Sequence, residues 1–235
     1  ARGALLTPIA KAFSTDSGNE ITYLGVQVHG GMGFIEETGA AQHYRDARIT
    51  TIYEGTNGIQ SIDLVTRKLG ANGGESVWKL LGELDATVKQ VEASNDPAFG
   101  ATGARLREAL GALERSSKWL LERMASAPND ALAGATPYLR LFGATLGGCM
   151  LAGEALAAKS TGEGEPQRYV ALARFFAENI TVQATSLEKT VTEAADAVSW
   201  LVAQHHRGLA WRQLAVLYRI NAQSEVYEAA LTEAG

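Results

Sequence analysis

Apolar residues recur at helical spacing through most of the chain after residue 75. Between residues 75 and 92 they form one stripe, which is typical of an amphipathic helix and consists of Val77, Leu80, Leu81, Leu84 and Val88. The same spacing predicts further helices at Leu106 to Leu121, Leu139 to Lys159, Tyr169 to Phe176, residues 180–202 and Leu209 to Leu231. Because this part shows no period-2 run and no strand rich in Val and Ile, it is predicted to be all-α, with antiparallel helices joined by short loops.

The first 70 residues show a different pattern, in which glycines divide short helical pieces. The helices predicted there are Gly3 to Phe13, Asp16 to Val28, Glu37 to Arg48 and Thr56 to Leu69. Asp16 or Ser17 can cap the second helix and Thr56 the fourth, because their side-chain oxygens can accept hydrogen bonds from first-turn amides. The glycine-rich segment LGANGGES (69–76) predicts a boundary between two helical domains, residues 1–70 and residues 75–235.

Composition and charge exclude several classes of protein. The chain has 235 residues, of which 46% are hydrophobic, and this is enough for a substantial core. Its net charge of -5 comes from scattered charges without a basic stripe, which argues against a nucleic-acid surface. The lone Cys149 excludes an intrachain disulfide, and its apolar neighbours predict a buried thiol.

The sequence also bears on targeting. No apolar run approaches the roughly 20 residues that cross a bilayer, so no membrane span is expected. The chain starts Ala1-Arg2-Gly3 and lacks the ordered segments of a signal peptide, so a cytoplasmic protein is expected. It begins without Met, which indicates a piece of a longer protein or a processed chain.

The segment GVQVHGGMGF (25–34) places Gly30, Gly31 and Gly33 after a predicted helix. This is not the dinucleotide-binding fingerprint, which follows a strand, and the segment carries no Walker lysine. The simplest interpretation is a helix C-cap followed by a turn, since glycine favours that position. The functional alternative is that bare backbone lets a phosphate or a planar ligand approach closely.

A second segment, RDARITTIYEGTNGIQ, places a single acid, Glu54, in a turn between an apolar run and a helix. Glu54 could simply be an acid that the dipole of the following helix favours. However, Gly55 and Gly58 leave backbone amides bare beside its carboxylate. Removal of a proton α to a carbonyl needs this pairing, because amides polarise the oxygen while the acid accepts the proton.

The histidines do not predict a metal site. His29 and His43 lack a set of partner ligands, and His205 and His206 are adjacent, so they cannot share a helix face as an i,i+4 pair would. We therefore expect no metal ion.

Together, the two motifs resemble the C-terminal signature of the acyl-CoA dehydrogenases. VQVHGGMGF is followed by YRDARITTIYEGTNGIQ, with Gln27 lying 27 positions before Glu54. The resemblance covers about residues 1–70. By pattern, the helices after residue 75 resemble the extra helical domain of one branch of the family, which includes the long-chain-type enzymes and those acting on 3-methylmercaptopropionyl-CoA.

The resemblance implies a role for each residue of the motifs. Glu54 would be the catalytic base, and its backbone N–H, with a flavin hydroxyl, would hold the thioester oxygen. Tyr53 and Gly55 would contact the substrate. The FAD of one subunit would be lined by Thr56, Asn57 and Gly58. The adenine and diphosphate part of FAD held by a neighbouring subunit would be touched by Gln27, Val28, His29, Gly30 and Gly31.

The implied reaction is the oxidation of an acyl-CoA thioester to a trans-2-enoyl-CoA. Glu54 would remove the α-proton, FAD would take the β-hydride, and an electron-transfer flavoprotein would accept the electrons. A free glutamic acid titrates near ~4.3, so burial between Ile52 and Ile59 is expected to raise its pKa once substrate expels water.

The resemblance also implies an assembly. Because FAD would be shared between subunits, the full-length protein is expected to be a homodimer or a dimer of dimers. The upstream helical domain and β-domain of the family do not occur in this sequence. The chain is therefore expected to be the C-terminal part of a longer enzyme and to be inactive alone.

Two positions depart from the family pattern. Many relatives carry glutamine where this chain has Gly58, so one side-chain contact to FAD is expected to be missing. Many carry an arginine that faces CoA where this chain has Thr66. Arg67 is one position later, roughly 100° around the helix, and is not assigned that role.

Two other functions remain open at this point. The chain could be a helical module that assembles subunits, with Glu54 inert, and the helices after residue 75 favour this for their own half. Alternatively, the protein could be an acyl-CoA oxidase that passes electrons to oxygen.

Overall fold

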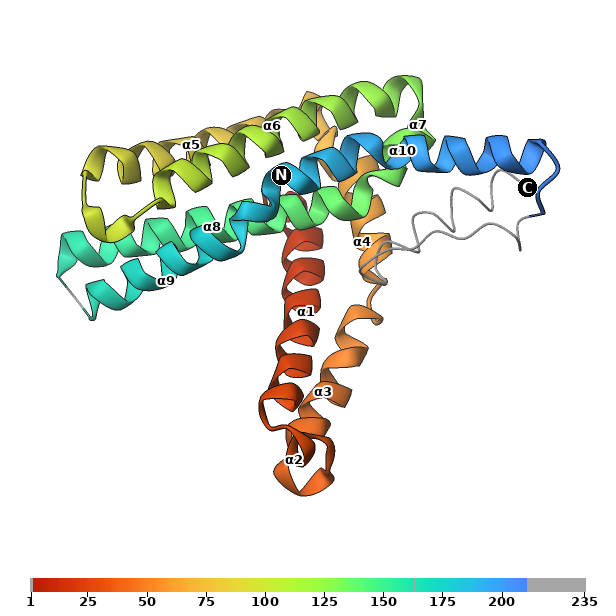
Figure 1. The fold of residues 1–235 in the computed structure, drawn as a ribbon. Helices are drawn as coiled ribbons and strands as arrows, with labels where there is room; N and C mark the ends of the chain where they lie inside the picture. Colours follow the sequence, from red (N-terminus) through yellow and green to blue (C-terminus); the bar gives the residue numbers. More distant parts are fainter. Residues whose placement is uncertain (1, 163, 211–235) are drawn as a thin grey trace.

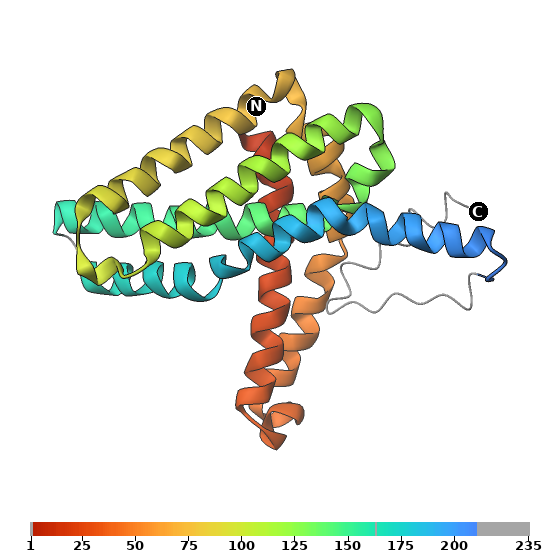
Figure 2. The ribbon, with the colours of Figure 1, turned by 45° about the horizontal axis from the view of Figure 1, so that its top comes forward.

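The computed structural model describes residues 2–162 and 164–210, and all regular structure in these residues is helical. The prediction of an all-α fold is therefore confirmed. Figure 1 shows an arm of paired helices projecting from a bundle that lies across its base, and Figure 2 shows the same arrangement from another side. The helix predicted from Leu209 to Leu231 falls almost wholly outside the described residues.

The arm consists of two antiparallel halves joined at a tip. Its elements are α1 (Arg2–Val28), α2 (Gly31–Phe34), η1 (Glu36–Thr38), α3 (Ala40–Arg48) and η2 (Ile49–Thr51). At the tip, Arg45 forms two parallel hydrogen bonds to the carboxylate of Glu36, at 2.9 and 2.7 Å, and so joins α3 to η1.

The bundle follows from the base of the arm to the end of the described chain. Its first elements are α4 (Asn57–Asp63), the π-helical turn η3 (Leu64–Leu69), η4 (Ala71–Gly74), α5 (Glu75–Ser94) and η5 (Pro97–Phe99). The later elements are α6 (Thr102–Ser126), α7 (Pro128–Ala133), α8 (Ala135–Thr161), α9 (Pro166–Asn179), η6 (Thr181–Gln183) and α10 (Ala184–His206).

The first helix differs from the prediction, because α1 runs without a break where two helices were expected. The polar residues at the expected break do not interrupt it, since Thr15 donates its hydroxyl to the carbonyl of Lys11 at 2.8 Å inside the helix. Asp16 is not a cap; its carboxylate accepts a hydrogen bond from Asn57 at 2.6 Å. Tertiary contacts therefore outweigh the local capping signal.

The helix expected from Glu37 to Arg48 is also divided. Gly39 has φ 76°, in the left-handed region, and separates the short η1 from α3. Glycine adopts this conformation without steric cost, so the chain can turn there before α3 begins.

One hydrophobic core joins the bundle to the base of the arm. The stripe predicted on α5 is buried and contacts the other bundle helices. Leu5 and Ile9 of α1, together with Leu64 and Leu69 of η3, belong to the same cluster. The core therefore continues across the glycine-rich segment 69–76, and the division into two domains at that segment stays a prediction.

The helix at the centre of the bundle is α8, which is also long and apolar enough to cross a membrane by length and composition. Its side chains Tyr138, Leu141 and Phe142 are fully buried in the protein core. Core helices pass the same length and composition test, so the absence of a membrane span stays a prediction. Cys149 on this helix is buried as predicted, and burial raises the pKa of its thiol to about 12.

Candidate active site

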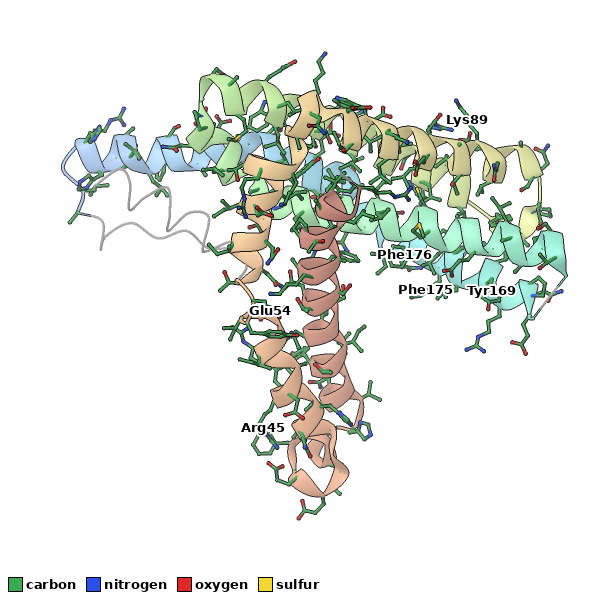
Figure 3. The ribbon with its side chains drawn as sticks, turned by 180° about the vertical axis from the view of Figure 1, so that it is seen from behind. Arg45, Glu54, Lys89, Tyr169, Phe175 and Phe176 are labelled. Atoms are coloured by element: carbon green, nitrogen blue, oxygen red, sulfur yellow. The ribbon has the colours of Figure 1, made fainter. Side chains whose placement is uncertain are left out.

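Glu54 lies in the turn between η2 and α4, where the arm meets the bundle (Figure 3). Its φ of 55° and the φ of 84° at Gly55 place two consecutive residues in the left-handed region. Glycine adopts this conformation freely, but a glutamate in it carries about 1–3 kcal/mol of strain. Such strain persists only where surrounding contacts determine the conformation.

Side chains from two helices hold the carbonyls of this turn. The ammonium of Lys11 on α1 donates a hydrogen bond to the carbonyl of Gly55 at 2.9 Å. The side-chain amide of Gln60 on α4 donates to the carbonyl of Glu54 at 3.0 Å. A hydrogen bond from a charged donor contributes about 1.5–3 kcal/mol, which is of the size needed to offset the strain.

The amides of the turn have no internal partner. Within the described residues, the backbone N–H groups of Glu54 and Gly55 donate no hydrogen bond. Both N–H groups therefore remain available in the turn that carries the carboxylate, and their use by a substrate stays a prediction. A carboxylate flanked by unused amide donors can accept a proton while the amides stabilise negative charge on a nearby oxygen.

The residues that follow Gly55 connect the turn to α1. Thr56 caps α4 as predicted, since its hydroxyl accepts a hydrogen bond from the amide of Ile59 at 3.3 Å. Asn57 is only 7% exposed, and its side chain donates to Asp16 at 2.6 Å and accepts from Lys11 at 2.7 Å.

These contacts bear on the residues predicted to line FAD. Gly58 is buried and Thr56 is half-buried, whereas the side chain of Asn57 is directed into α1. Contact of Thr56, Asn57 and Gly58 with FAD stays a prediction. For Asn57 such a contact would use the backbone, because its side-chain atoms are already bonded.

The side chains around Glu54 are exposed. Ile52, Tyr53 and Ile59 are 44%, 49% and 55% exposed, and Glu54 is exposed as well. The expected burial of Glu54 between Ile52 and Ile59 is therefore not formed by this chain alone. The three apolar side chains instead form an uncovered surface around the carboxylate, and burial there requires a further surface to cover it.

The glycine motif lies at the tip of the arm. Gln27 and Val28 end α1, His29 and Gly30 form the turn, and Gly31 begins α2. The amide of Gly30 donates to the carbonyl of Gln27 at 3.0 Å, which confirms the predicted turn at the helix end. All five residues are exposed, and a side chain at Gly30 or Gly31 would meet no atom within 4 Å. The backbone here is open to a ligand.

The two motifs occupy opposite ends of the arm (Figures 1 and 3). Asn57 contacts Asp16 on α1, and Gln27 lies 11 residues farther along the same helix. At ~1.5 Å per residue, this separates the motifs by about 16 Å along the helix axis. One chain therefore does not bring both motifs to the same reacting atoms.

Comparison with known families identifies the family to which this chain belongs. The family model described as "Acetyl-CoA dehydrogenase C-terminal like" matches residues 80–201, which is over half of the chain. The model described as "Acyl-CoA dehydrogenase, C-terminal domain" matches residues 3–69. The chain belongs to the acyl-CoA dehydrogenase family. The resemblance identified from its motifs is thereby confirmed.

Individual acyl-CoA dehydrogenases show the extent of the similarity. The chain is 39% identical over 198 residues to 3-methylmercaptopropionyl-CoA dehydrogenase from Ruegeria pomeroyi, covering 82% of this chain and 34% of that protein. It is 30% identical over 182 residues to a butyryl-CoA dehydrogenase from Syntrophomonas wolfei, covering 74% of this chain and 29% of that protein. The chain thus spans about a third of the length of these relatives.

The fold is shared with a solved acyl-CoA dehydrogenase. The structure from Bacillus anthracis, determined as a complex with FAD, matches with a TM-score of 0.65 at 19% identity. The match covers 98% of this chain and 39% of that chain. At this identity, the match supports the fold of this acyl-CoA dehydrogenase chain.

Of the two positions that depart from the family pattern, Gly58 is buried in the first turn of α4 and Thr66 lies in η3. The hydroxyl of Thr66 donates to the carbonyl of Ile62 at 2.8 Å. Arg67 is largely exposed and pairs with Asp63, the last residue of α4. The absence of a role for Arg67 in binding CoA stays a prediction.

The contacts of three residues in and next to the turn were missed from the sequence: Lys11 and Gln60 bind its carbonyls, and Asp16 binds Asn57. A signal was present for the first of them, because polar residues recur on α1 at four-residue spacing, at Lys11, Thr15 and Asn19. This stripe faces the other half of the arm, where Asn19 donates to the carbonyl of Ala47 at 2.9 Å. A polar stripe beside the buried positions of a helix indicates hydrogen bonds to a neighbouring segment.

Proposed function

We propose that this chain is the C-terminal part of an FAD-dependent acyl-CoA dehydrogenase in which Glu54 is the catalytic base. The observation that carries the proposal is the turn at the base of the arm. There the backbone of Glu54 is held in the left-handed region, and the N–H groups of Glu54 and Gly55 donate no hydrogen bond within the described residues. Membership of the acyl-CoA dehydrogenase family supports the assignment of this carboxylate as a base that acts on an acyl-CoA.

The reaction divides between the carboxylate and the backbone. The carboxylate of Glu54 accepts the α-proton of the acyl-CoA thioester, while the N–H of Glu54 donates to the thioester oxygen. This donor stabilises the negative charge that develops on the oxygen as the proton leaves, and one such donor is worth about 3 kcal/mol. FAD, when bound, supplies the chemistry that accepts the β-hydride. The product is a trans-2-enoyl-CoA.

The residues around the turn would contact the acyl chain and help to exclude water from Glu54. Tyr53 and Gly55 lie beside the carboxylate, where an acyl chain would contact them. Covering the exposed Ile52 and Ile59 would exclude water from Glu54. Substrate and the rest of the enzyme together would provide that cover.

The tip of the arm fits the adenine and diphosphate part of FAD. A diphosphate requires close approach to backbone amides, and the open backbone at Gly30 and Gly31 allows it. As the family resemblance implies, the FAD that the tip contacts would belong to a neighbouring subunit. The proposed enzyme would then be a homodimer or a dimer of dimers.

The electron acceptor of the proposed enzyme follows the family resemblance, and its location follows the sequence. Its electrons would pass to an electron-transfer flavoprotein, and it would act in the cytoplasm. Residues 75–235 would form the appended helical domain. Its helices contact α1 and α4, and we assign this domain a role in oligomerisation or in shielding the site.

Anaerobic titration of the flavin-loaded enzyme with acyl-CoAs of increasing chain length tests the proposal. We expect bleaching of the oxidised flavin with a preferred chain length, and formation of the matching enoyl-CoA. Absence of bleaching with every acyl-CoA would contradict the assignment and favour a non-catalytic helical module. Under air, stoichiometric release of peroxide without reduction of a dye acceptor would instead show an acyl-CoA oxidase.

A further inference from the structure

Lys11 is 44 positions away from Gly55 in the sequence but contacts it directly. Its ammonium donates to the carbonyl of Gly55 at 2.9 Å and to the side-chain oxygen of Asn57 at 2.7 Å. It also lies 5.9 Å from the centre of the Tyr53 ring, on the other side of Glu54 in sequence. A single cation therefore contacts residues that precede and follow Glu54 in the sequence.

We propose that Lys11 is a positioning residue that holds Glu54 in its catalytic conformation. This proposal rests on the proposed function, because it assigns Lys11 a part in the proton transfer by Glu54. Lys11 acts through the backbone and does not itself accept the proton.

The geometry of the peptide bond explains how a cation on α1 directs the turn. In a trans peptide the carbonyl and the following N–H point in opposite directions. Lys11 and Gln60 draw the carbonyls of Gly55 and Glu54 toward the protein. The N–H groups of Thr56 and Gly55 are consequently directed away from these side chains, and the left-handed backbone at Glu54 is fixed.

Asn57 secures Lys11 in this position. Its side-chain amide donates to the carboxylate of Asp16 at 2.6 Å and to the carbonyl of Ala12 at 3.2 Å. The same side chain accepts from Lys11, so Lys11, Asn57 and Asp16 form one chain of hydrogen bonds. Because α1 is packed into the bundle core through Leu5 and Ile9, the bundle anchors the turn through this network.

Replacement of Lys11 by Met tests the proposal, because Met keeps the length of the side chain and removes its charge and donors. Lys68→Met is the matched control, since Lys68 is half-buried like Lys11 but lies outside the turn, where it pairs with Asp63 at 3.5 Å. Lys11→Arg restores a charged donor. Lys11→Gln, which keeps a neutral donor, replaces Lys11→Met in both assays if the Met variant does not fold.

The first readout needs no cofactor. A protease that cleaves after glutamate is applied to the 235-residue chain, and cleavage after Glu54 is followed by mass spectrometry. We expect cleavage at Glu54 to be at least 10-fold faster in Lys11→Met and unchanged in Lys68→Met. Lys11→Arg is expected to recover at least half of the protection. Cleavage after the exposed Glu37 at the tip is expected to stay the same in all variants.

The second readout is the rate of flavin reduction by acyl-CoA in the flavin-loaded enzyme. We expect Lys11→Met to lower kcat at least 10-fold, with KM changed less than twofold and FAD content unchanged. A residue that only stabilises the fold would lower the melting temperature without this selective loss of kcat.

The outcomes separate this proposal from the proposed function. Unchanged cleavage at Glu54 in Lys11→Met overturns the positioning role, and so does faster cleavage with wild-type flavin reduction. Wild-type flavin reduction in Glu54→Gln would instead overturn Glu54 as the base. In that case the proteolysis result would still report whether Lys11 holds the turn. The contribution of Lys11 to catalysis would no longer follow.

Discussion

Glu54→Gln in the flavin-loaded enzyme should leave FAD bound and slow flavin reduction by acyl-CoA about 100- to 10,000-fold. This is the range that a positioned general base contributes. Glutamine has the same size and shape, but its side-chain amide does not accept the α-proton. The contacts that hold the turn involve the backbone carbonyls of Glu54 and Gly55, so the substitution leaves them intact.

A control variant makes the result for Glu54→Gln interpretable. Glu37→Gln, at an exposed acid on the arm tip, serves as the control and should reduce its flavin at the wild-type rate. Stopped-flow absorbance of the oxidised flavin measures both variants. If Glu54→Gln bleached as fast as wild type with full FAD content, the base would have to be another group.

Phe142→Ala is expected to lower the free energy of unfolding of the bundle strongly. Phe142 is fully buried on α8, and its ring packs edge-on against Tyr138 with the ring centres 5.8 Å apart. The Tyr138 hydroxyl is in turn hydrogen-bonded to Ser117 at 2.8 Å. Removing a buried phenyl ring costs about 3–5 kcal/mol, through lost burial and the cavity that remains.

Thermal unfolding of the chain measures this effect. At about 2–4 °C per kcal/mol for a chain of this size, the melting temperature should fall by roughly 10 °C. Phe175→Ala is the matched control, because Phe175 on α9 is 59% exposed (Figure 3) and surface substitutions change stability by about 0.5 kcal/mol or less. Equal shifts for the two variants would contradict the assignment of Phe142 to the core.

Much of the bundle could be predicted from the sequence because its helices are amphipathic. The apolar stripe of α5 is buried as its spacing predicted, and α8, expected to end at Lys159, ends at Thr161. Thr56 caps α4, because a cap depends only on residues within one helical turn. Each of these features is encoded by neighbouring residues, which is why the sequence was sufficient to identify them.

Other features depend on contacts that local sequence does not encode. The capping signal at Asp16 was misleading, because its carboxylate binds Asn57 from a distant segment. The left-handed conformation of Glu54 was likewise hidden, since the residues that hold its turn come from two different helices. The exposure of Ile52 and Ile59 was also unexpected, because their pattern is that of buried residues and the surface that would cover them is not formed by this chain.

A crystal structure of the flavin-loaded enzyme with a bound acyl-CoA analogue would show whether the carboxylate of Glu54 meets the α-carbon of an acyl-CoA. We expect the Glu54 carboxylate within about 3–3.5 Å of the α-carbon, with the thioester oxygen accepting a hydrogen bond from the N–H of Glu54. A thioester bound with its α-carbon against a different acid, and with Glu54 facing solvent, would contradict this expectation.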